Sequence, residues 1–227
     1  MEGVSLITTS DGSHTLLNTV LNEPYHSVHG ALTESLHVFI SNGLDVILKR
    51  DLPLVRILEV GFGTGLNALL TLGRTQHFTA RIEYTAIETN PVDLSLIKNL
   101  NFIQDQRLKK FHKEFMALHE APWNRSAYVT PQFEIHKIKI GLDDFESSSQ
   151  FDLIYYDAFA PNKQPDMWTS EALGRVENLM SPNGIFVTYC AKGEVKRTLR
   201  SLGLTVYSVP GPPRKREMIL AKKIPAI

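Results

Sequence analysis

The chain has 227 residues, of which 43% are hydrophobic, and its 24 basic and 24 acidic side chains give no formal net charge. This length suits one α/β domain with a full core and a small appendage. The balance of charge excludes the overall basicity of a dedicated nucleic-acid binder. The single cysteine, Cys190, excludes an internal disulfide and, with no Cys/His pairs at ligand spacing, argues against a zinc site.

Charge is unevenly distributed along the chain. From residue 192 to the end, nine Lys and Arg residues stand against two Glu residues, a net of +7 that leaves −7 for residues 1–191. This asymmetry predicts one surface suited to an anionic partner. The sequence shows no N-terminal signal pattern and no apolar run of 18 residues, so we expect a cytoplasmic protein with no membrane contact.

Residues 1–50 are predicted to form a small extension, made of a β-hairpin and a helix, ahead of a main domain over residues 51–227. Two β-prone runs within residues 1–22 flank Asp11-Gly12, a strong tight-turn signal. Residues 22–27 are expected to be irregular. From Ala31 to Leu48, apolar residues recur at helical spacing and predict one helix.

Three histidines, His26, His29 and His37, lie close together in this extension. Histidine is a common metal ligand, but no carboxylate or cysteine stands at a suitable spacing to complete a site. We therefore expect these side chains to face solvent or to stabilise loops, and we predict no metal centre.

The most informative stretch is Ile57–Leu66, an apolar run that breaks into three alternate glycines. The apolar residues over 55–60 predict a short buried strand. The glycines allow a tight turn and let a ligand approach the backbone. Because the next residues have helical composition, their free N–H groups would point back at the turn. A strand, a glycine turn and a helix in this order are typical of a nucleotide-type cofactor site at the carboxyl end of a parallel sheet.

Glu59 distinguishes between the ligands that such a turn can hold. A carboxylate here suits a ligand that carries an ammonium and a sulfonium, whereas it would repel a diphosphate. The spacing E-x-G-x-G-x-G resembles motif I of S-adenosylmethionine (SAM) methyltransferases, and an ordinary tight turn is the alternative. The motif predicts six SAM-binding residues: Glu59, Gly61, Phe62, Gly63, Gly65 and Asn67.

A second predicted strand, over residues 81–88, ends in Glu88, which lies 23 residues beyond Gly65. At that point of a dinucleotide-type unit a carboxylate accepts hydrogen bonds from ribose hydroxyls. We therefore predict that Glu88 binds the adenosyl ribose, with a surface acid or a helix N-cap as the alternative. A helix is expected over Val92–Leu100, with Pro91 in its first turn.

Residues 102–130 are predicted to be a helical insertion, with an amphipathic helix from Gln104 to Glu120. The third strand, Phe133–Ile140, alternates apolar and polar residues, as at the edge of a sheet. Asp143 and Asp144 follow it. An acid at this point can accept a hydrogen bond from the exocyclic amine of adenine, and N-capping of a helix by Asp144 is the alternative.

A fourth predicted strand, Phe151–Tyr156, leads directly into Asp157. An acid at the carboxyl end of a central strand lies beside the glycine turn, at the switch point of the sheet. Two prolines and three large apolar residues follow within residues 158–168 and predict a stiff wall next to this acid.

The remaining elements complete an α/β fold. We expect a Rossmann-like SAM-dependent methyltransferase fold, with a seven-stranded, mostly parallel sheet that ends in a C-terminal antiparallel hairpin. Its last elements are predicted as a helix over 170–179, a turn at 182–184, a strand over 185–190, a helix over 194–202 and strands over 204–209 and 217–221.

The segment Asp157–Trp168 resembles the signature of a known family: the methyltransferase domain of the bifunctional enzyme that completes 5-methylaminomethyl-2-thiouridine at the tRNA wobble position. Residues 61–67 match that family's motif I, and residues 214–218 resemble its Arg-Lys-Arg-Glu-Met segment. Weaker similarity to its N-terminal segments is carried by Glu34 with Val38-Phe39, and by Tyr25-His26-Ser27. The resemblance implies that substrate is bound by Tyr25, Ser27, Phe159, Pro161, Met167 and Trp168. Arg214, Lys215 and Arg216 lie in one hairpin of the basic C-terminal region, and this charge predicts that they contact tRNA phosphates, with a solvated hairpin turn as the alternative.

The resemblance also implies methyl transfer from SAM to the primary amine of 5-aminomethyl-(2-thio)uridine in tRNA. The amine must be neutral to attack, and a free alkylamine has a pKa near 10, as lysine does, so a proton has to leave. We predict that Asp157 orients the amine and accepts this proton, while burial beside Phe159, Pro161 and Trp168 lowers the pKa of the amine. A purely structural Asp157 that caps its own loop is the alternative.

Members of this family often carry a FAD-dependent oxidase domain after the methyltransferase, and this chain ends at Ile227 without one. We therefore expect SAM to be its only cofactor, with no FAD, and tRNA to be its partner, with no obligate protein partner. We also expect it to act only on tRNA that already carries a free aminomethyl group. In the family the acid after the third strand follows a glycine directly, whereas Leu142 intervenes here, so the choice between Asp143 and Asp144 stays open.

Three other functions share part of the pattern. An NAD-dependent dehydrogenase would share the glycine turn and Glu88, but the sequence shows no hydride-transfer His or Tyr–Lys set. An aminopropyltransferase also places an acid after the fourth strand and handles amines. A non-catalytic RNA-binding module would bind tRNA without methylating it, and the intact SAM motif argues against it.

Overall fold

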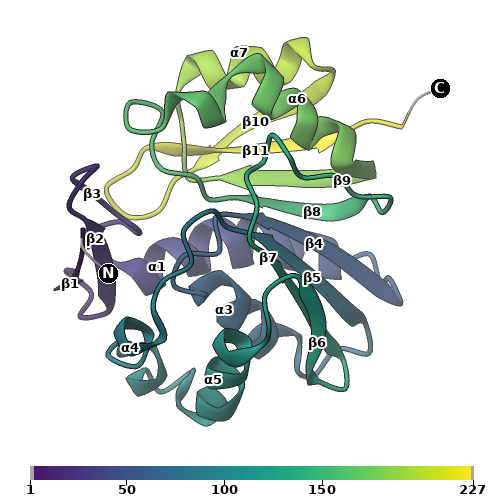
Figure 1. Ribbon diagram of the computed structural model, residues 1–227. Coiled ribbons are helices and arrows are strands. Elements are labelled where there is room, and N and C mark those ends of the chain that lie inside the picture. The colour runs from purple at the N-terminus through teal and green to yellow at the C-terminus, as the bar shows by residue number, and fades with distance from the viewer. Residues whose placement is uncertain (1–2, 226–227) are drawn as a thin grey trace.

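A single eight-stranded sheet forms the centre of the molecule, with helices on both faces (Figure 1). The computed structural model describes residues 3–225. The sheet order is β10-β11-β9-β8-β4-β5-β7-β6. The parallel strands β4 and β8 lie in the middle, and their apolar runs suit strands buried on both faces. The strands are β4 (Leu54–Val60), β5 (Arg81–Ile87), β6 (Arg125–Thr130), β7 (Phe133–Ile138), β8 (Phe151–Tyr156), β9 (Met180–Thr188), β10 (Leu204–Pro210) and β11 (Glu217–Lys223).

Two hydrophobic cores lie on opposite faces of this sheet, because successive side chains of a strand point to opposite faces. Within β4, Val55 and Ile57 belong to one core, and Leu58 and Val60 belong to the other. The first core is covered by the helix over residues 31–48 and by α3 (Leu66–Thr75), α4 (Leu94–Ile97) and α5 (His112–Glu120). The second core is covered by α6 (Ser170–Leu179) and α7 (Gly193–Ser201), at the top of Figure 1.

The helix predicted over residues 31–48 is confirmed with those bounds. It consists of α1 (Ala31–Ser35), a π-helical stretch (Leu36–Leu44) and α2 (Asp45–Leu48). Gly43 lets this helix pack closely on the sheet, because a Cβ there would lie 3.1 Å from Cγ2 of Val187 and 3.3 Å from the side chains of Leu153 and Tyr155. The helix therefore brings its first turn, which carries Glu34, to the carboxyl ends of the central strands.

The N-terminal hairpin is also confirmed and is part of a small three-stranded sheet, at the left of Figure 1. Its strands are β1 (Val4–Thr8), β2 (His14–Asn18) and β3 (Glu23–Pro24). The tight turn uses Gly12 at φ +83°, a backbone conformation that favours glycine. The prediction that residues 22–27 are irregular was wrong at Glu23–Pro24, because these two residues pair with Leu17 and Asn18 of β2.

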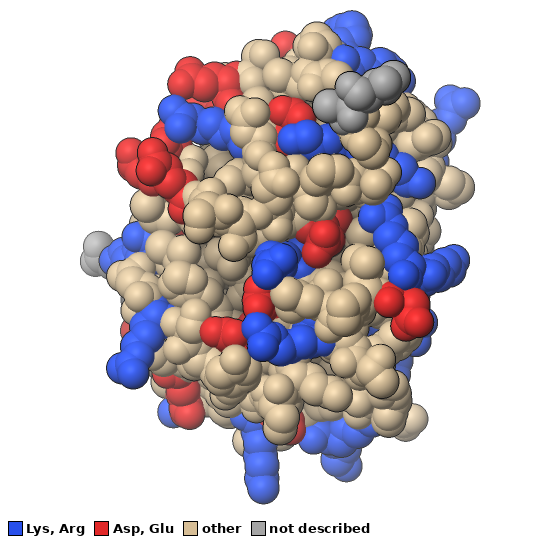
Figure 2. Space-filling view, turned by 90° about the vertical axis from the view of Figure 1, so that its right-hand side faces the viewer, with Lys and Arg blue, Asp and Glu red and all other residues tan. Residues whose placement is uncertain are grey.

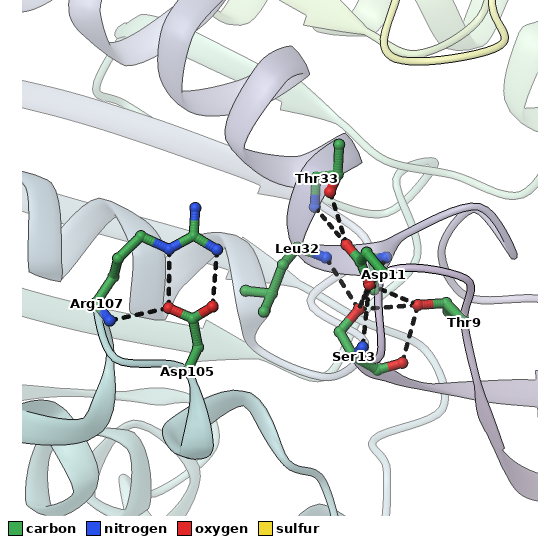
Figure 3. A network of polar contacts seen from close by, with 8 residues as sticks. Thr9, Asp11, Ser13, Leu32, Thr33, Asp105 and Arg107 are labelled. Atoms are coloured by element: carbon green, nitrogen blue, oxygen red, sulfur yellow. Dashed lines mark hydrogen bonds and ion pairs between the residues drawn. The ribbon is translucent and has the colours of Figure 1, made fainter.

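Polar side chains of the hairpin turn cap the start of α1 (Figure 3). The first N–H groups of a helix have no partner within the helix. Here Ser13 Oγ accepts hydrogen bonds from the backbone N–H groups of Ala31 and Leu32, at 3.1 and 3.3 Å, and Asp11 Oδ2 accepts one from Thr33 at 3.1 Å. The hairpin and the helix are thereby held together although about 20 residues separate them in sequence.

Within residues 102–130 the structure corrects the predicted helical insertion. Residues 125–130 form β6, an antiparallel edge strand beside β7, so the sheet has eight strands and β7 is not at its edge. The chain reverses into β6 at Asn124, where φ is +60°, and Asn124 Oδ1 accepts a hydrogen bond from the backbone of Lys139. The polar composition of β6 reflects its exposed edge position, which is why apolar periodicity did not reveal it.

Two predicted helices are shorter than expected. The helix expected over 92–100 covers only Leu94–Ile97, because Asp93 caps it by accepting a hydrogen bond from the backbone of Ser95. The helix expected over 104–120 begins at His112; before it, Asp105 binds the backbone and side chain of Arg107 in a loop between two short 3₁₀ turns (Phe102–Gln104 and Lys109–Phe111). This Asp105–Arg107 pair lies at the left of Figure 3.

The predicted strand over 185–190 starts earlier, at Met180, and ends at Thr188. The predicted turn at 182–184 lies within strand β9, at a point where the pairing of β9 with β8 is interrupted. Met180 pairs with Phe151 and Ile185 pairs with Leu153, so the intervening residues leave the register, and Asn183 takes a positive φ of +65°. Among the described helices, none is both long enough and apolar enough to cross a membrane.

The capping role of Asp11 gives a stability prediction. Burial opposes ionisation of this carboxyl, but hydrogen bonds from Ser13, Thr33 and Thr9 outweigh it and lower the pKa of Asp11 to about 2. We expect Asp11→Ala to lower the free energy of unfolding by about 1–2 kcal/mol, as for loss of a helix cap. Because the folded pKa lies below the unfolded value of about 3.9, the loss is complete above pH 4 and shrinks as the pH falls towards 2.

Urea denaturation between pH 2 and pH 7 measures this effect. Asp144→Ala is the matched control, because Asp144 is exposed and caps no helix among the described residues. An Asp11→Ala protein as stable as the control variant at pH 7 would contradict the capping role.

Candidate active site

A cavity of about 770 Å³ opens at the carboxyl ends of the central strands. Strand β4 has β5 on one side and β8 on the other, so the order of the chain reverses between them. In open α/β sheets this switch point is where ligands bind. The floor of the cavity is formed by the glycine turn after β4 and by Asp157 after β8, and its outer wall is formed by the N-terminal sheet.

The glycine turn needs its glycines for two physical reasons. Gly61, Gly63 and Gly65 have φ values of +92°, +49° and +68°, which other residues rarely adopt. A Cβ at Gly61 would lie 2.7 Å from the backbone oxygen of Asp157, so glycine allows β4 and β8 to approach each other at this point. A Cβ at Gly63 would lie 3.1 Å from the ring of Tyr25, on the cavity side of the turn.

Two acids are held together beneath the cavity by one side-chain amide. Asn67 Nδ2 donates hydrogen bonds of 2.9 Å to Glu59 Oε1 and of 2.9 Å to Asp157 Oδ2. Glu59 is fully buried, and its Oε2 atom has no hydrogen-bond partner among the described residues. Asp157 lines the cavity itself. The first turn of α3 therefore couples the strand-end acid of β4 to the strand-end acid of β8.

Both acids have a raised proton affinity. Burial raises the pKa of Glu59 well above its ordinary value, and the neighbouring Asp157 raises it further. Burial and the charge of Glu34 raise the pKa of Asp157 to about 8, although the hydrogen bond from Asn67 and the charge of Lys215 oppose the shift. Perturbed carboxyl groups in a cleft are typical of functional sites.

Glu88 lies at the opposite end of the glycine turn, just after β5. Its Oε2 accepts a hydrogen bond of 3.1 Å from the backbone of Gly63, and its Oε1 accepts one of 2.9 Å from the backbone of Asn90. These bonds fix the carboxylate at the edge of the cavity. Because each carboxylate oxygen can accept two hydrogen bonds, both retain acceptor capacity for ligand hydroxyl groups.

An aromatic wall follows Asp157. The Phe159 ring meets the Tyr25 ring edge-on, with the centroids 5.2 Å apart. The backbone of Phe159 is fixed from both sides, since its N–H donates to Gln164 Oε1 at 3.2 Å and its carbonyl accepts from Trp168 Nε1 at 2.8 Å. The Trp168 ring packs on Tyr156 beneath the wall. Trp168 therefore supports the wall from inside the protein and does not face the cavity.

A charged contact closes the far side of the cavity. Lys215 Nζ, from the turn between β10 and β11, lies 2.7 Å from Glu34 Oε1 and 4.4 Å from the centroid of the Tyr189 ring. Glu34 Oε2 in turn accepts a hydrogen bond of 2.7 Å from the backbone of Ser27. The Tyr189 hydroxyl donates to the carbonyl of Ala158 at 2.9 Å. These contacts tie the C-terminal hairpin to the N-terminal extension across the site.

The structure brings most of the predicted site residues to the cavity but leaves others outside it. Tyr25, Ser27, Gly61, Phe62, Gly63, Asn67, Glu88, Asp143, Asp157, Phe159, Met167 and Lys215 line the cavity. The predicted residues that do not line it are Glu59, Gly65, Asp144, Pro161, Trp168, Arg214 and Arg216. Of the two acids after β7, only Asp143 reaches the cavity, and it lies 3.7 Å from Arg175 in an exposed ion pair.

Sequence reasoning missed several lining residues. Glu34 was noted only as part of a weak similarity, and it lies off the apolar stripe of its helix, so the helical pattern gave no signal for it. Tyr189 lies in the strand predicted over 185–190, and Gln164 lies in the wall predicted within 158–168. Both segments were predicted from their apolar residues and prolines, which did not single out these two side chains. The remaining lining residues that were not predicted come from the N-terminal extension, whose docking here no local pattern showed, and from the strand ends and loops of the central sheet.

The histidines behave as predicted in part. His26 is buried, and its Nδ1 lies 2.8 Å from Thr15 Oγ1, so it stabilises the start of the extension. Burial lowers the pKa of His26 to about 4. His29 contacts Arg214, and His37 contacts the carbonyl of Pro210. Across residues 3–225 there is no group of three His, Cys, Asp or Glu residues that could hold a metal ion.

The C-terminal excess of basic residues does not form one surface. Strand β11 begins next to Arg216 and ends in Lys222 and Lys223, so the basic residues at its two ends lie roughly 20 Å apart. Three lysines of the excess are ion-paired: Lys196 with Glu217, Lys215 with Glu34, and Lys223 with Glu177. Figure 2 shows the side on which the C-terminus emerges, where basic and acidic side chains are interspersed.

The comparisons with known proteins agree with this fold and site. Residues 100–224 match the S-adenosyl-L-methionine-dependent methyltransferase family. The chain is 30% identical over 222 residues to the tRNA 5-methylaminomethyl-2-thiouridine biosynthesis bifunctional protein MnmC of Pseudoalteromonas translucida, which covers 86% of this chain and 33% of that protein. It is 30% identical over 220 residues to the protein of the same name from Ralstonia nicotianae, covering 88% and 32%.

Among solved structures, the chain is similar to the crystal structure of MNMC2 from Aquifex aeolicus. The TM-score is 0.81 at 25% sequence identity, and the match covers 100% of this chain and 73% of that chain. The chain spans about a third of the length of the curated relatives that it matches.

The fold, the glycine turn and the matched residues together define a SAM-dependent methyltransferase. The chain belongs to the S-adenosyl-L-methionine-dependent methyltransferase family, and its expected fold class and resemblance are confirmed. This assignment favours methyl transfer over the hydride-transfer and aminopropyl-transfer alternatives, and over a non-catalytic RNA-binding module.

The residues of the cavity fit SAM. The glycine turn leaves open the space that a Cβ at Gly63 would enter. Glu88 retains acceptors for ribose hydroxyls, and Asn67 Oδ1 is buried without a hydrogen-bond partner among the described residues. The cavity is also rich in carboxylates, which suits a ligand that carries an ammonium and a sulfonium.

The glycine turn gives a binding prediction. We expect Gly63→Val to abolish SAM binding, because its side chain would enter the space beside Tyr25 that the turn leaves open. Isothermal titration calorimetry with SAM measures the effect. Gly12→Val is the matched control, since Gly12 has a similar positive φ but no atom within 4 Å of the added Cβ. Unchanged SAM affinity in a folded Gly63→Val protein would refute this placement.

Asp157 gives a prediction about pH and stability. The pKa of Asp157 is about 8 in the folded protein and about 3.9 in the unfolded chain. Between these two values the carboxyl is ionised only in the unfolded chain, so the free energy of unfolding falls as the pH rises from about 3.9 to about 8. We therefore expect Asp157→Asn to be more stable than the natural protein at pH 9 and equally stable at pH 4. Urea midpoints at both pH values measure the difference, and a destabilised Asp157→Asn protein at pH 9 would count against the burial of this charge.

Proposed function

We propose that this chain transfers a methyl group from SAM to the primary amine of 5-aminomethyl-(2-thio)uridine at the wobble position of tRNA. The names of the curated relatives give the substrate class, since those proteins take part in the biosynthesis of 5-methylaminomethyl-2-thiouridine in tRNA. The observation that carries the proposal to this chain is Asp157, a half-buried acid of high proton affinity in the floor of the cavity, next to an aromatic wall.

The charges that line the cavity support a cationic substrate. Lys215 is the only Lys or Arg among the described lining residues, and it is paired with Glu34. The lining acids are Glu23, Glu34, Glu88, Asp143, Asp157 and Asp166. An amine that arrives as an ammonium is attracted to such a site, whereas a carboxymethyl group on the same amine would add a negative charge among these acids. The proposal therefore includes a preference for the free aminomethyl form.

The chemistry that the chain's own residues supply is proton removal and alignment. Bound SAM supplies an electrophilic methyl group on a positively charged sulfur. Asp157 is proposed to hold the amine by a hydrogen bond and, in its ionised form, to accept the amine proton. Its raised pKa makes that carboxylate a stronger base than the carboxylate of an exposed Asp. Asn67 fixes the Asp157 carboxylate, and so the direction in which the amine is held. Holding the two reactants in line supplies much of the acceleration.

The aromatic wall is proposed to hold the uracil ring. Sequence-specific recognition of RNA usually stacks unpaired bases on aromatic side chains. Tyr25 and Phe159 offer such surfaces from two different elements, beside Asp157. Outside the cavity, Arg214 and Arg216 are exposed and are proposed to contact tRNA phosphates. SAM is the only cofactor in this proposal, and we place the reaction in the cytoplasm with tRNA as the partner.

Mass spectrometry of nucleosides tests the proposal. Purified protein is incubated with SAM and with tRNA that carries either the aminomethyl or the carboxymethylaminomethyl group on its wobble uridine. We expect one methyl group to be added to the aminomethyl form only, and Asp157→Asn to lower the rate by at least about 100-fold, the scale of lost general-base catalysis.

Two features make this test decisive. Asp144→Asn removes an acid outside the cavity and is the matched control, expected to keep the natural rate. Methylation of the carboxymethylaminomethyl form at a comparable rate would contradict the charge argument. An Asp157→Asn enzyme with unchanged activity would remove Asp157 from the mechanism.

A further inference from the structure

Lys215 stands apart from the two arginines beside it in the turn between β10 and β11. Arg214 and Arg216 are exposed, whereas the Lys215 side chain is turned into the cavity and is only 35% exposed. Its ammonium lies 2.7 Å from Glu34 Oε1 and over the Tyr189 ring. A lysine held between a buried carboxylate and an aromatic face is poorly placed to reach a phosphate of a bound tRNA.

Glu34 is a built partner for this lysine. Its side chain is 8% exposed, and its second oxygen is already held by the backbone N–H of Ser27 at 2.7 Å. The Glu34 carboxylate is therefore held by α1 and by the N-terminal segment independently of Lys215, which comes from the other end of the chain. If the lysine were removed, a buried carboxylate would remain without a cation, which is costly.

A second path leads from Lys215 to the backbone next to Asp157. The ammonium lies 4.4 Å from the centre of the Tyr189 ring, and the Tyr189 hydroxyl donates a 2.9 Å hydrogen bond to the carbonyl of Ala158. Ala158 directly follows Asp157. A cation over the face of an aromatic ring is attracted to it, so Lys215 holds Tyr189 in the orientation that fixes this carbonyl.

We propose that Lys215 is a positioning residue for Asp157: it balances the charge of Glu34 and holds Tyr189, and so sets the proton affinity and orientation of the acid in the cavity floor. This role rests on the proposed function, in which Asp157 receives the amine proton. It assigns Lys215 to the methyl-transfer site, not to the phosphate-contacting surface that the neighbouring arginines suggest.

The groups that face Asp157 come from every element around it. Two of these groups are carboxyls, Glu59 at the end of β4 and Glu34 of α1. Two are buried phenols, Tyr84 of β5 and Tyr189 after β9. Lys215 is the one cation that acts on Asp157 among the described residues. Glu34 raises the pKa of Asp157 and Lys215 lowers it, so the two members of the pair act on this acid in opposite directions.

Carbon-detected NMR titration of the Asp157 carboxyl in the protein without ligands tests the proposal, with Asp157→Asn used to assign the signal. We expect Lys215→Met to move the midpoint to higher pH by up to about one unit, and Glu34→Gln to move it to lower pH. Lys215→Arg keeps the ion pair and is expected to keep the natural midpoint. Arg216→Met removes the same charge from the same turn and is expected to leave the Asp157 midpoint unchanged.

The salt dependence of tRNA binding separates this role from phosphate contact. We expect Arg216→Met to reduce the slope of log affinity against log salt by about 1, and Lys215→Met to leave the slope unchanged. A Lys215→Met protein with a natural Asp157 midpoint, or with the same loss of slope as Arg216→Met, would overturn the proposal. If Lys215→Met does not fold, an unshifted midpoint in Glu34→Gln overturns it as well.

These outcomes are distinct from those that test the proposed function. The titration needs neither SAM nor tRNA, so a shifted midpoint supports the positioning role even if the aminomethyl substrate is not methylated. Conversely, methylation of that substrate by a Lys215→Met protein with unchanged rate and unchanged pH profile would leave the function standing and remove Lys215 from the site.

Discussion

One amide group holds a buried acid and a half-buried acid together, and the rest of the site depends on it. Asn67 Nδ2 lies 2.9 Å from a carboxylate oxygen of Glu59 and 2.9 Å from one of Asp157. Two carboxylates that share a buried environment repel each other when both are ionised, so at least one is held neutral near pH 7. A hydrogen-bond donor between them makes the arrangement tolerable, although neither acid forms an ion pair with a cation among the described residues.

The architecture follows from the need to bring these three residues together. Glu59 lies in β4, Asn67 lies in the first turn of α3, and Asp157 follows β8, so the strands must be neighbours and the turn between β4 and α3 must be tight. Gly61 makes the close approach possible, because any side chain there would meet the backbone oxygen of Asp157. The N-terminal sheet and the C-terminal hairpin then enclose the site, and Lys215 joins them through Glu34.

The central part of this arrangement was predictable from the sequence, because it depends on local patterns. A buried strand, a glycine turn and an acid at a strand end each leave a clear local signal. Gly61, Glu88 and Asp157, which these signals selected, all line the cavity, and their roles stay predictions. Glu59 was expected to meet the ligand but lies beneath the floor. Spacing along the chain shows that Glu59 is at the turn, but it does not show the direction of the Glu59 side chain. That direction depends on contacts with α3, where Asn67 binds the carboxylate.

What could not be predicted depends on contacts between distant segments. Lys215 was grouped with Arg214 and Arg216 by composition, and only the position of Glu34, 181 residues earlier, separates it from them. Strand β6 was missed because an exposed edge strand needs few apolar residues. The cap of α1 comes from Ser13 and Asp11 of the hairpin, so its start carries no capping residue of its own.

The central claim is that the paired acids are held partly neutral until a cation reaches the cavity. Calorimetry of SAM binding at pH 7, in two buffers of different ionisation enthalpy, measures the protons that are exchanged on binding. Because the pKa of Asp157 is about 8 in the unliganded protein, and a cation favours the carboxylate, the account predicts a net release of protons. This release should be smaller with S-adenosylhomocysteine, which lacks the sulfonium charge, and smaller in Asp157→Asn. SAM binding with no proton release in either buffer would contradict it.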